Sequence, residues 1–500
     1  MSKKKIIVIG GGLGGLSTGI YAQMNGYETT IYEKNPVPGG LAACWKRKDY
    51  LIDGGIHFLT GYKPGLSLYN VFKEVGAHKA EYVDIEIYAR YIDEKSERVV
   101  DISSDLGLFQ SDLLSLFPED KKKIRHFIKA IRGLSKTDIS EFGFKEPMEL
   151  MNTIDWIKEF WQNRKALKYF VGKSMQPVKD YVKNIHDPMF KELLLYMFLP
   201  SVPIAFLWMI LSFVSQKQMG VLKRGSLDFA KKLEERFLAL GGKILYNSKV
   251  SSILVEENKA VGIRTEDGEE HNSDFVISAN DGRTVIYEML EGAYTNDKID
   301  RRYKEWKTVV PFVCLSFGVD MEFKDEVWMT FFKTTDPIQV GDEEKEHVII
   351  RFFNYSPYFA PDGKTVIQVD LETNWEYWFT LRKDKQKYDR AKKDLAERTI
   401  EWLEKRYPGI KDKIEVVDVA TPYTFWRYTL NEKGSYMGFL PYSDTFTSNI
   451  EKRLPGLEGF YMAGQWSMTT GGVQSVIYSG KHVIQLLCND ESKEFIMQAN

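Results

Sequence analysis

The first part of the chain alternates short apolar runs with one longer helical pattern. Residues 5–9 form a run rich in β-branched side chains, which is typical of a strand buried in a parallel sheet. Residues 16–25 have the apolar spacing of a helix that ends before Gly26, and residues 28–32 form a second strand-like run. A strand, a helix and a strand in this order predict a βαβ unit.

Similar patterns return in two later parts of the chain. We expect an amphipathic helix at 227–240, followed by strands at 243–246, 250–255 and 274–280 and a hairpin through Asp267-Gly268. A strand at 459–466 then precedes a glycine-rich turn at 470–475, which opens a helix reaching Leu487. These segments predict an α/β fold with a discontinuous parallel sheet of the Rossmann type.

Residues 193–216 contain no charged side chain, and by length they resemble a membrane span. Pro200 and Pro203 interrupt them, so we expect a pair of helices inside an inserted domain. Two interpretations stay open: the pair is buried, or it forms a lipid-facing patch or tunnel mouth that draws substrate from a bilayer.

Aromatic residues also gather in the inserted parts. One helical stripe lies beside several lysines, which suits an anionic membrane surface or a core face with a solvated flank. It consists of Trp156, Ile157, Phe160 and Trp161. Three further aromatic groups, at 352–359, 375–379 and 423–428, are expected to be strands of one sheet, suited to a long apolar substrate or to plain packing.

Composition narrows the classes of partner and compartment. The 500 residues carry a net charge of −2, so no basic excess indicates a nucleic-acid partner. The three cysteines (Cys44, Cys314 and Cys488) are far apart and predict neither a disulfide framework nor a zinc site, which fits a reducing cytoplasm. The seven histidines are scattered, and no metal site is expected. The apolar run at the start is too short for a signal peptide.

The loop after the first strand carries the clearest chemistry. Gly10, Gly12 and Gly15 satisfy the pattern GxGxxG between a strand and a helix. These glycines allow a tight turn, a close approach of a pyrophosphate and close packing of the helix on the strand. Glu33 follows 18 residues after Gly15, where a carboxylate accepts hydrogen bonds from a ribose and disfavours a 2′-phosphate.

Three further segments resemble one family. They are Gly39-Gly40-Leu41, the Asp-Gly-Gly-Ile-His-Phe run at 53–58, and the Ala-Gly-Gln-Trp run at 463–466. Together with the first motif they resemble the FAD-dependent phytoene desaturase and retinol saturase-like family, within the amine oxidase and Rab GDP-dissociation inhibitor flavoprotein superfamily. Two positions depart from the pattern of many members, which carry Arg in place of Leu41 and Asp in place of Gln465.

The resemblance implies FAD as the cofactor and a Rossmann-type FAD-binding domain built from residues 1–75, 215–290 and 455–500. Residues 76–214 and 291–454 would form a substrate domain with a mixed sheet and an apolar helical part at about 150–214. The implied cofactor contacts are Gly10, Gly12, Leu13, Gly14, Gly15, Glu33, Lys34, Gly39, Gly40, Leu41, Gly55, Ile56, His57, Val250, Asn280, Gly464, Gln465, Gly472 and Val473.

The expected function is that of an FAD-dependent oxidoreductase. It would desaturate, saturate or isomerise C=C bonds of a hydrophobic isoprenoid, carotenoid, retinoid or unsaturated fatty acyl substrate. His57 is the candidate acid or base, with a purely structural histidine as the alternative. Two alternative hypotheses remain: an amine oxidase, and a prenyl-binding or lipid-binding protein without redox chemistry.

Two further expectations concern the redox partner of the protein and its place in the cell. A quinone, a ferredoxin-like carrier and oxygen all stay open as the electron donor or acceptor. We expect a cytoplasmic protein with a peripheral contact to the inner face of the membrane.

Overall fold

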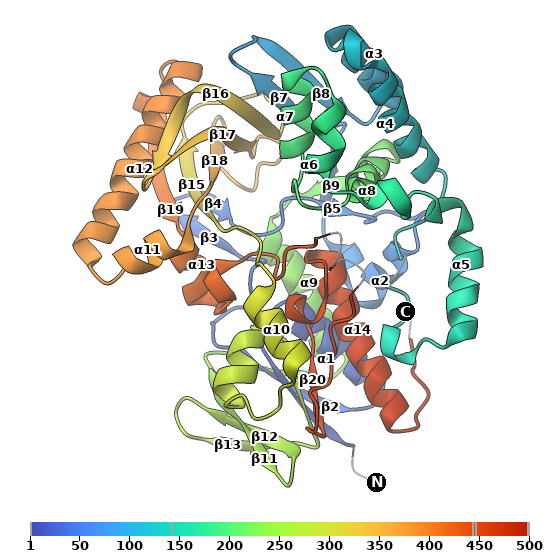
Figure 1. Ribbon diagram of the computed structural model, residues 1–500. Helices are drawn as coiled ribbons and strands as arrows, with labels where there is room; N and C mark the ends of the chain where they lie inside the picture. The colour runs from blue at the N-terminus through green and yellow to red at the C-terminus, as the bar shows by residue number, and fades with distance from the viewer. Residues whose placement is uncertain (1–2, 142–143, 443–444, 446–447, 498–500) are drawn as a thin grey trace.

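A five-stranded parallel sheet forms the base of the molecule in the computed structural model, which describes residues 3–141, 144–442, 445 and 448–497 (Figure 1). Four separate parts of the chain supply its strands. In spatial order the strands are β10 (Lys243–Leu245), β2 (Glu28–Tyr32), β1 (Lys5–Ile9), β14 (Phe275–Ser278) and β20 (Phe460–Met462). The prediction of a discontinuous parallel sheet is confirmed.

Three helices pack together beside this sheet. Helix α1 (Leu13–Met24) contacts both α9 (Ser226–Ala239) and α14 (Val473–Asp490). Helix α1 begins three residues earlier than expected, because Gly12 is its N-cap and the glycine loop passes directly into the helix. A small antiparallel sheet adjoins this base and includes the expected hairpin. Its strands are β11 (Val250–Glu256), β12 (Lys259–Thr265) and β13 (Glu270–Asn272).

A seven-stranded mixed sheet forms the second layer. It is antiparallel except for the parallel pairing of β16 with β7. Helix α12 (Lys385–Arg406) packs against it, with Trp402 and Leu403 in the shared core. The strands in spatial order are β19 (Ile414–Ala420), β15 (Phe312–Val319), β18 (Thr365–Glu372), β17 (Glu343–Phe352), β16 (Met329–Val340), β7 (Ile87–Asp93) and β8 (Arg98–Ser103).

A group of helices lies on the other side of the mixed sheet (Figure 1). The apolar stretch at 193–216 contributes to two of them, and the chain between them contains Pro200 and Pro203, as expected. Among the described residues, no helix is both long and apolar enough to cross a membrane. The helices of this group are α3 (Leu106–Leu116), α4 (Lys121–Leu134), α5 (Thr153–Leu167), α6 (Val178–Tyr181), α7 (Pro188–Tyr196) and α8 (Ile204–Ser215).

Shorter elements join these layers. Strands β5, β9 and β6 form a small antiparallel sheet, and β3 pairs with β4. Their bounds are β3 (Cys44–Arg47), β4 (Tyr50–Asp53), β5 (Leu59–Thr60), β6 (Tyr82–Asp84) and β9 (Met219–Leu222), and the remaining helices are α2 (Leu68–Glu74), α10 (Asp297–Glu305), α11 (Trp375–Leu381) and α13 (Pro422–Thr429).

One expectation about the aromatic groups is wrong. Residues 352–359, 375–379 and 423–428 were expected to be strands, but only Phe352 belongs to one, at the end of β17, and residues 353–359 lie outside the helices and strands. Residues 375–379 and 423–428 lie in helices α11 and α13. Trp375 stacks on Phe379 at a centroid distance of 4.7 Å, four residues along the chain. An i to i+4 contact of this kind is the spacing of a helix face. The bounds of the two domains remain predictions.

A buried ion pair ties α14 to α2 and should matter for stability. Lys481 Nζ lies 3.1 Å from Glu74 Oε2, both side chains are almost fully buried, and the Tyr21 hydroxyl donates to the same oxygen at 2.5 Å. Removing one member of a buried pair leaves an uncompensated charge.

We therefore expect Lys481→Met to lower the free energy of unfolding by about 3 kcal/mol, measured by urea denaturation at equal flavin content. The double variant Lys481→Met with Glu74→Gln should recover much of that loss, because no buried charge remains. A single variant within about 1 kcal/mol of the wild type would contradict this account.

Candidate active site

One cavity of about 890 Å³ connects the two layers. It begins at the carboxyl ends of β1, β2, β14 and β20, where ligands bind in open parallel sheets. All the cofactor residues implied by the sequence line this cavity, with the exception of Gly15. The structure therefore brings together segments as far apart in the chain as Gly10 and Val473.

Gly15 contributes in another way. A Cβ atom at this position would lie 1.9 Å from the carbonyl oxygen of Gly10. The side of α1 that carries Gly15 therefore touches the backbone of the glycine loop. Its part is close packing of the helix on the strand, not contact with the cavity.

Two helices start at the cavity without a capping side chain. Gly12 is the N-cap of α1 and Gly472 is the N-cap of α14. A Cβ on Gly12 would come no closer than 3.9 Å to protein, and one on Gly472 would meet nothing within 4 Å. The free N–H groups and the positive dipole ends of both helices therefore face open space, which suits phosphate or another anionic group.

Glu33 is buried at the end of β2. Its Oε2 accepts a hydrogen bond from the Gly11 amide at 2.7 Å, and its Oε1 accepts from the amide and the side chain of Asn35, both at 2.7 Å. Burial raises the pKa of this carboxyl, and these hydrogen bonds oppose the rise. A carboxylate has about four acceptor positions and three are occupied here, so Oε2 keeps one position for a ribose hydroxyl.

The loop that carries His57 is held from two sides. Asp53 Oδ1 accepts from the Gly55 amide at 3.0 Å, and the Ile56 amide donates to Ser226 Oγ at 2.6 Å. Burial, together with the nearby charge of Arg351, holds the pKa of His57 well below its usual value. The imidazole that faces the cavity is therefore neutral at pH 7.

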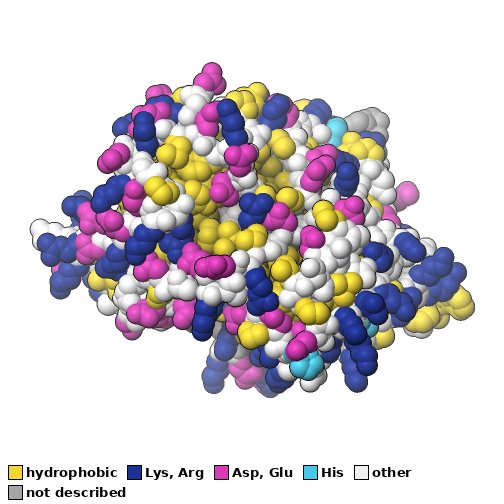
Figure 2. Space-filling model, turned by 90° about the horizontal axis from the view of Figure 1, so that it is seen from above, with side chains coloured by type: hydrophobic (Ala, Val, Ile, Leu, Met, Phe, Trp, Pro, Cys, Tyr) yellow, Lys and Arg dark blue, Asp and Glu magenta, His cyan; other side chains and the backbone are white. Residues whose placement is uncertain are grey.

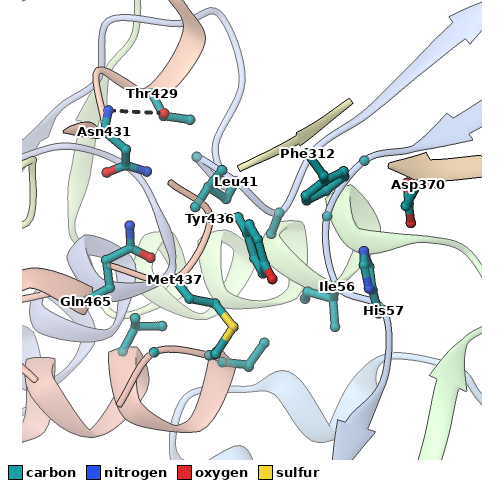
Figure 3. Close-up of a pocket in the computed structure, with 18 of the residues that line it drawn as sticks. Leu41, Ile56, His57, Phe312, Asp370, Thr429, Asn431, Tyr436, Met437 and Gln465 are labelled. Carbon is teal, nitrogen blue, oxygen red and sulfur yellow. Dashed lines mark hydrogen bonds between the residues drawn. The ribbon is translucent and has the colours of Figure 1, made fainter. Parts of the chain in front are cut away.

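Several residues of the site were missed by sequence reasoning. His57 lies beside Phe312, at a centroid distance of 6.2 Å, and Asp370 and Tyr436 approach the same space (Figure 3). Asp370 Oδ2 accepts from Arg351 Nε at 3.1 Å inside the protein. Phe312 and Asp370 stand on strands without any motif, so the sequence held no signal for them. Tyr436 lies in the stretch from Gly434 to Gly438, which also resembles the last substrate-domain segment of the family, but the resemblance gives Tyr436 no role.

The two positions that depart from the family pattern both line the cavity. Gln465 Nε2 is buried and has no hydrogen-bond partner among the described residues. Such an atom needs an acceptor, and a polar group of a bound cofactor would supply it. Leu41 instead packs against the cluster that contains Phe312 and Phe425. These two residues therefore fit a bound dinucleotide, because Gln465 offers a hydrogen-bond donor to a polar group and Leu41 offers an apolar surface.

Beyond the glycine-rich half, the cavity turns apolar. It extends between the mixed sheet and the α7–α8 pair, and Figure 2 shows a hollowed face in which hydrophobic side chains lie among charged ones. Charged side chains line its far part, where His347 Nε2 lies 2.9 Å from Glu192 Oε2. The apolar lining includes Met197, Phe198, Phe206, Met209, Phe213 and Phe331.

Curated relatives match along nearly the whole chain. The chain is 24% identical to a chloroplastic prolycopene isomerase of Arabidopsis thaliana, over 95% of this chain and 81% of the relative. It is 23% identical to a 4,4'-diaponeurosporene oxygenase of Staphylococcus haemolyticus, over 97% of both chains. It is 24% identical to a neurosporene-forming phytoene desaturase of Rhodobacter capsulatus, over 97% of this chain and 94% of the relative.

Solved structures share the fold at low identity. An oxidoreductase from Methanosarcina mazei has a TM-score of 0.62 at 18% identity and covers 96% of this chain and all of its own. Putrescine oxidase bound to putrescine scores 0.60 at 12% identity, covering 98% of this chain and 99% of its own. Rab GDI from Plasmodium falciparum scores 0.52 at 11% identity, covering 99% of both chains. These similarities support the fold.

A family model settles the class. The model described as flavin containing amine oxidoreductase matches residues 13–487, almost the whole chain. This match and the curated relatives confirm the expected class of FAD-dependent oxidoreductase. The chain belongs to the flavin containing amine oxidoreductase family.

Proposed function

We propose that this protein uses FAD to add, remove or shift hydrogen at the C=C bonds of a long acyclic isoprenoid of the carotenoid type. The observation that carries the proposal is the continuity of the cavity. Its glycine-rich part, with two uncapped helix N-termini, opens directly into a chamber lined by methionine, leucine and aromatic side chains. The relatives named for prolycopene isomerisation and phytoene desaturation support the choice of substrate.

The first part of the cavity would hold the cofactor. Gly12 and the start of α1 would face its pyrophosphate, Glu33 its ribose, and Val250 its adenine. Gly472 and Val473, at the start of α14, would face the polar edge of the flavin, and Gln465 would bind its ribityl chain. When bound, the flavin supplies hydride transfer at its N5.

The second part would exclude water and align the hydrocarbon. Phe331, Phe206 and Phe213 come from separate elements and line a chamber that offers a polyene few polar partners. An apolar wall of this kind binds by the area it removes from water. Such substrates dissolve in bilayers, so the proposal includes a peripheral contact with the cytoplasmic face of a membrane.

His57 would handle the proton that accompanies the hydride. Because the imidazole is neutral, it accepts a proton rather than donating one at pH 7. Its low pKa makes it a weak base. A weak base suffices where loss of hydride makes the neighbouring C–H acidic.

The substrate class is tested with defined compounds. We expect phytoene or prolycopene, supplied in vesicles with either oxygen or a quinone as acceptor, to show altered double bonds by chromatography and absorbance. Putrescine serves as the matched amine. Oxidation of putrescine with no change in either carotene would overturn the proposal.

Two glycine variants separate cofactor binding from folding. Gly12→Ala meets no protein atom closer than 3.9 Å and has an ordinary φ of −70°, so it should fold with a stability within about 1 kcal/mol of the wild type. Its methyl group would occupy the pyrophosphate space, and we expect FAD affinity to fall at least about tenfold, measured by flavin fluorescence.

Gly15→Ala is the contrasting variant. Its Cβ collides with the Gly10 backbone, so we expect a loss of about 2 kcal/mol or more in unfolding free energy. A Gly12→Ala protein that keeps full FAD occupancy would show that the pyrophosphate does not approach this residue.

The proton role of His57 predicts a specific kinetic loss. His57→Gln should keep FAD yet lower the single-turnover rate by roughly 10²-fold or more. The wild-type rate should not change between about pH 6 and 9 through this group, because its pKa lies well below that range. His186→Gln, whose side chain is 70% exposed, is the control. A His57→Gln rate within threefold of the wild type would assign a structural role to this histidine.

A further inference from the structure

Helix α5 presents its large hydrophobic side chains to solvent. On a helical wheel these side chains share one arc of about 160°. The side that faces the protein carries Ala166, the buried residue of this helix, with Asp155 and Asn163 half-buried near it. A helix that packs on its own protein shows the reverse arrangement. The exposed residues are Ile154, Trp156, Ile157, Phe160 and Trp161, with exposed fractions between 46 and 62%.

The helix forms from local signals. Asn152 accepts hydrogen bonds from the amides of Ile154 and Asp155, and the Asp155 side chain accepts from the Asn152 amide, which completes a capping box. A cap of this kind contributes about 1 kcal/mol, while a helix of 15 residues is marginal on its own in water. Helix α5 therefore has a stabilising N-terminal cap but gains little stability from burial. Contact with a second surface would bury its hydrophobic side chains, which the protein itself leaves exposed.

The charges around the apolar arc are mainly positive. Arg164 lies inside the arc, and its guanidinium stands 5.8 Å from the centre of the Trp161 ring. Residues 153–173 contain five Lys or Arg against two Asp or Glu. At the right edge of Figure 2, the side on which α5 lies in Figure 1, hydrophobic side chains stand among Lys and Arg.

A second basic helix meets the end of α5. The Tyr169 hydroxyl packs so closely on Gly133 of α4 that a Cβ there would lie 1.8 Å from it. Helix α4 buries its apolar face and exposes its basic one. The exposed basic side chains of α4 and the aromatic arc of α5 therefore lie on neighbouring elements of the surface. The exposed basic residues of α4 are Lys121, Lys122, Arg125, Lys129 and Arg132.

We propose that α5 docks this protein on an anionic lipid bilayer. Trp156, Phe160 and Trp161 would enter the interface between headgroups and acyl chains, and the Lys and Arg side chains would contact lipid phosphates. An arginine within the apolar arc suits this boundary, whereas a dry protein groove would leave its charge unpaired. A second copy of α5 is disfavoured, because it would bring two positive surfaces together.

The docking helix is connected to the wall of the cavity. After α5 the chain runs alongside the α7–α8 connection, where the Val178 amide donates to the Val202 carbonyl at 2.9 Å and the Lys179 amide donates to the Pro200 carbonyl at 3.0 Å. Pro200 lines the apolar chamber. The segment that follows α5 therefore contacts the wall of the chamber that would receive the hydrocarbon, so a bilayer bound at α5 would be connected to that wall through this segment.

Co-sedimentation of the whole flavoprotein with vesicles tests the proposal. We expect binding to vesicles of phosphatidylglycerol and phosphatidylcholine, and weak binding to phosphatidylcholine alone or at high salt. Trp156→Ser with Trp161→Ser should lower the partition coefficient at least about tenfold. Lys165→Glu with Lys168→Glu should lower it at least about 25-fold, at about fivefold for each lysine charge lost.

Matched variants at other exposed sites control for general effects. Leu238→Ser with Val417→Ser replaces hydrophobic residues that are 46 and 45% exposed. Lys387→Glu with Lys393→Glu changes lysines of α12 whose side chains are 73 and 76% exposed. Both pairs should bind vesicles like the wild type. Flavin content and circular dichroism confirm that each variant is folded.

The outcomes are distinct. Equal binding to neutral and anionic vesicles, or equal losses in the control pairs, would overturn the proposal. A wild type that ignores vesicles but forms dimers, which Trp156→Ser with Trp161→Ser dissociates, would assign the face to a second copy instead. The proposal does not rest on the flavin reaction, since vesicle binding is measured without turnover.

Discussion

The contact on which the site depends is a backbone-to-backbone approach between the two ends of the chain. A Cβ on Gly14 would lie 2.9 Å from the Cα of Gly464, and one on Gly480 would lie 2.5 Å from the amide of Thr18. The Gly464 amide also donates to Ser479 Oγ at 2.7 Å. Because α1 and α14 touch without intervening side chains, both of their free N-termini reach one cavity. Larger residues at these positions would separate the two halves of the cofactor cradle.

The cofactor half was predictable because its requirements lie within short, continuous segments. A strand, a glycine loop and a helix must follow one another to present free amides to a phosphate, so β1 and β2 match their expected bounds. The start of α1 was placed too late, since Leu13 and Gly14 read as loop although Gly12 already caps the helix. The C-terminal strand and the glycine turn after it were predicted, whereas the parallel pairing of β20 with β14 is known only from the structure.

The substrate half was not predictable to the same degree. Phe312 on β15, Asp370 on β18 and Tyr436 in a loop line the same cavity as His57, and no local pattern at these positions predicts that they come together. The aromatic groups left a site for a long apolar substrate and plain packing both open, and they did not indicate which residues form the walls of a chamber. For α11 and α13 the spacing of the aromatic residues was interpreted wrongly as that of a strand. Aromatic residues three and four positions apart share one face of a helix, as the stacking of Tyr423 on Trp426 also shows. Conformation there depends on distant neighbours.

Hydrophobicity alone also fails to say which helix meets a membrane. Helix α8 has no charge and is buried almost throughout, because a uniformly apolar helix finds its partners inside the protein. Helix α5 is far less apolar, yet it exposes Trp156 and Trp161 beside basic side chains. A charge such as that of Arg164 must stay hydrated or paired, which bars its arc from a dry core. The exposed face of α5, which combines aromatic and basic side chains, is therefore better suited to a boundary between water and lipid than the more apolar helix α8.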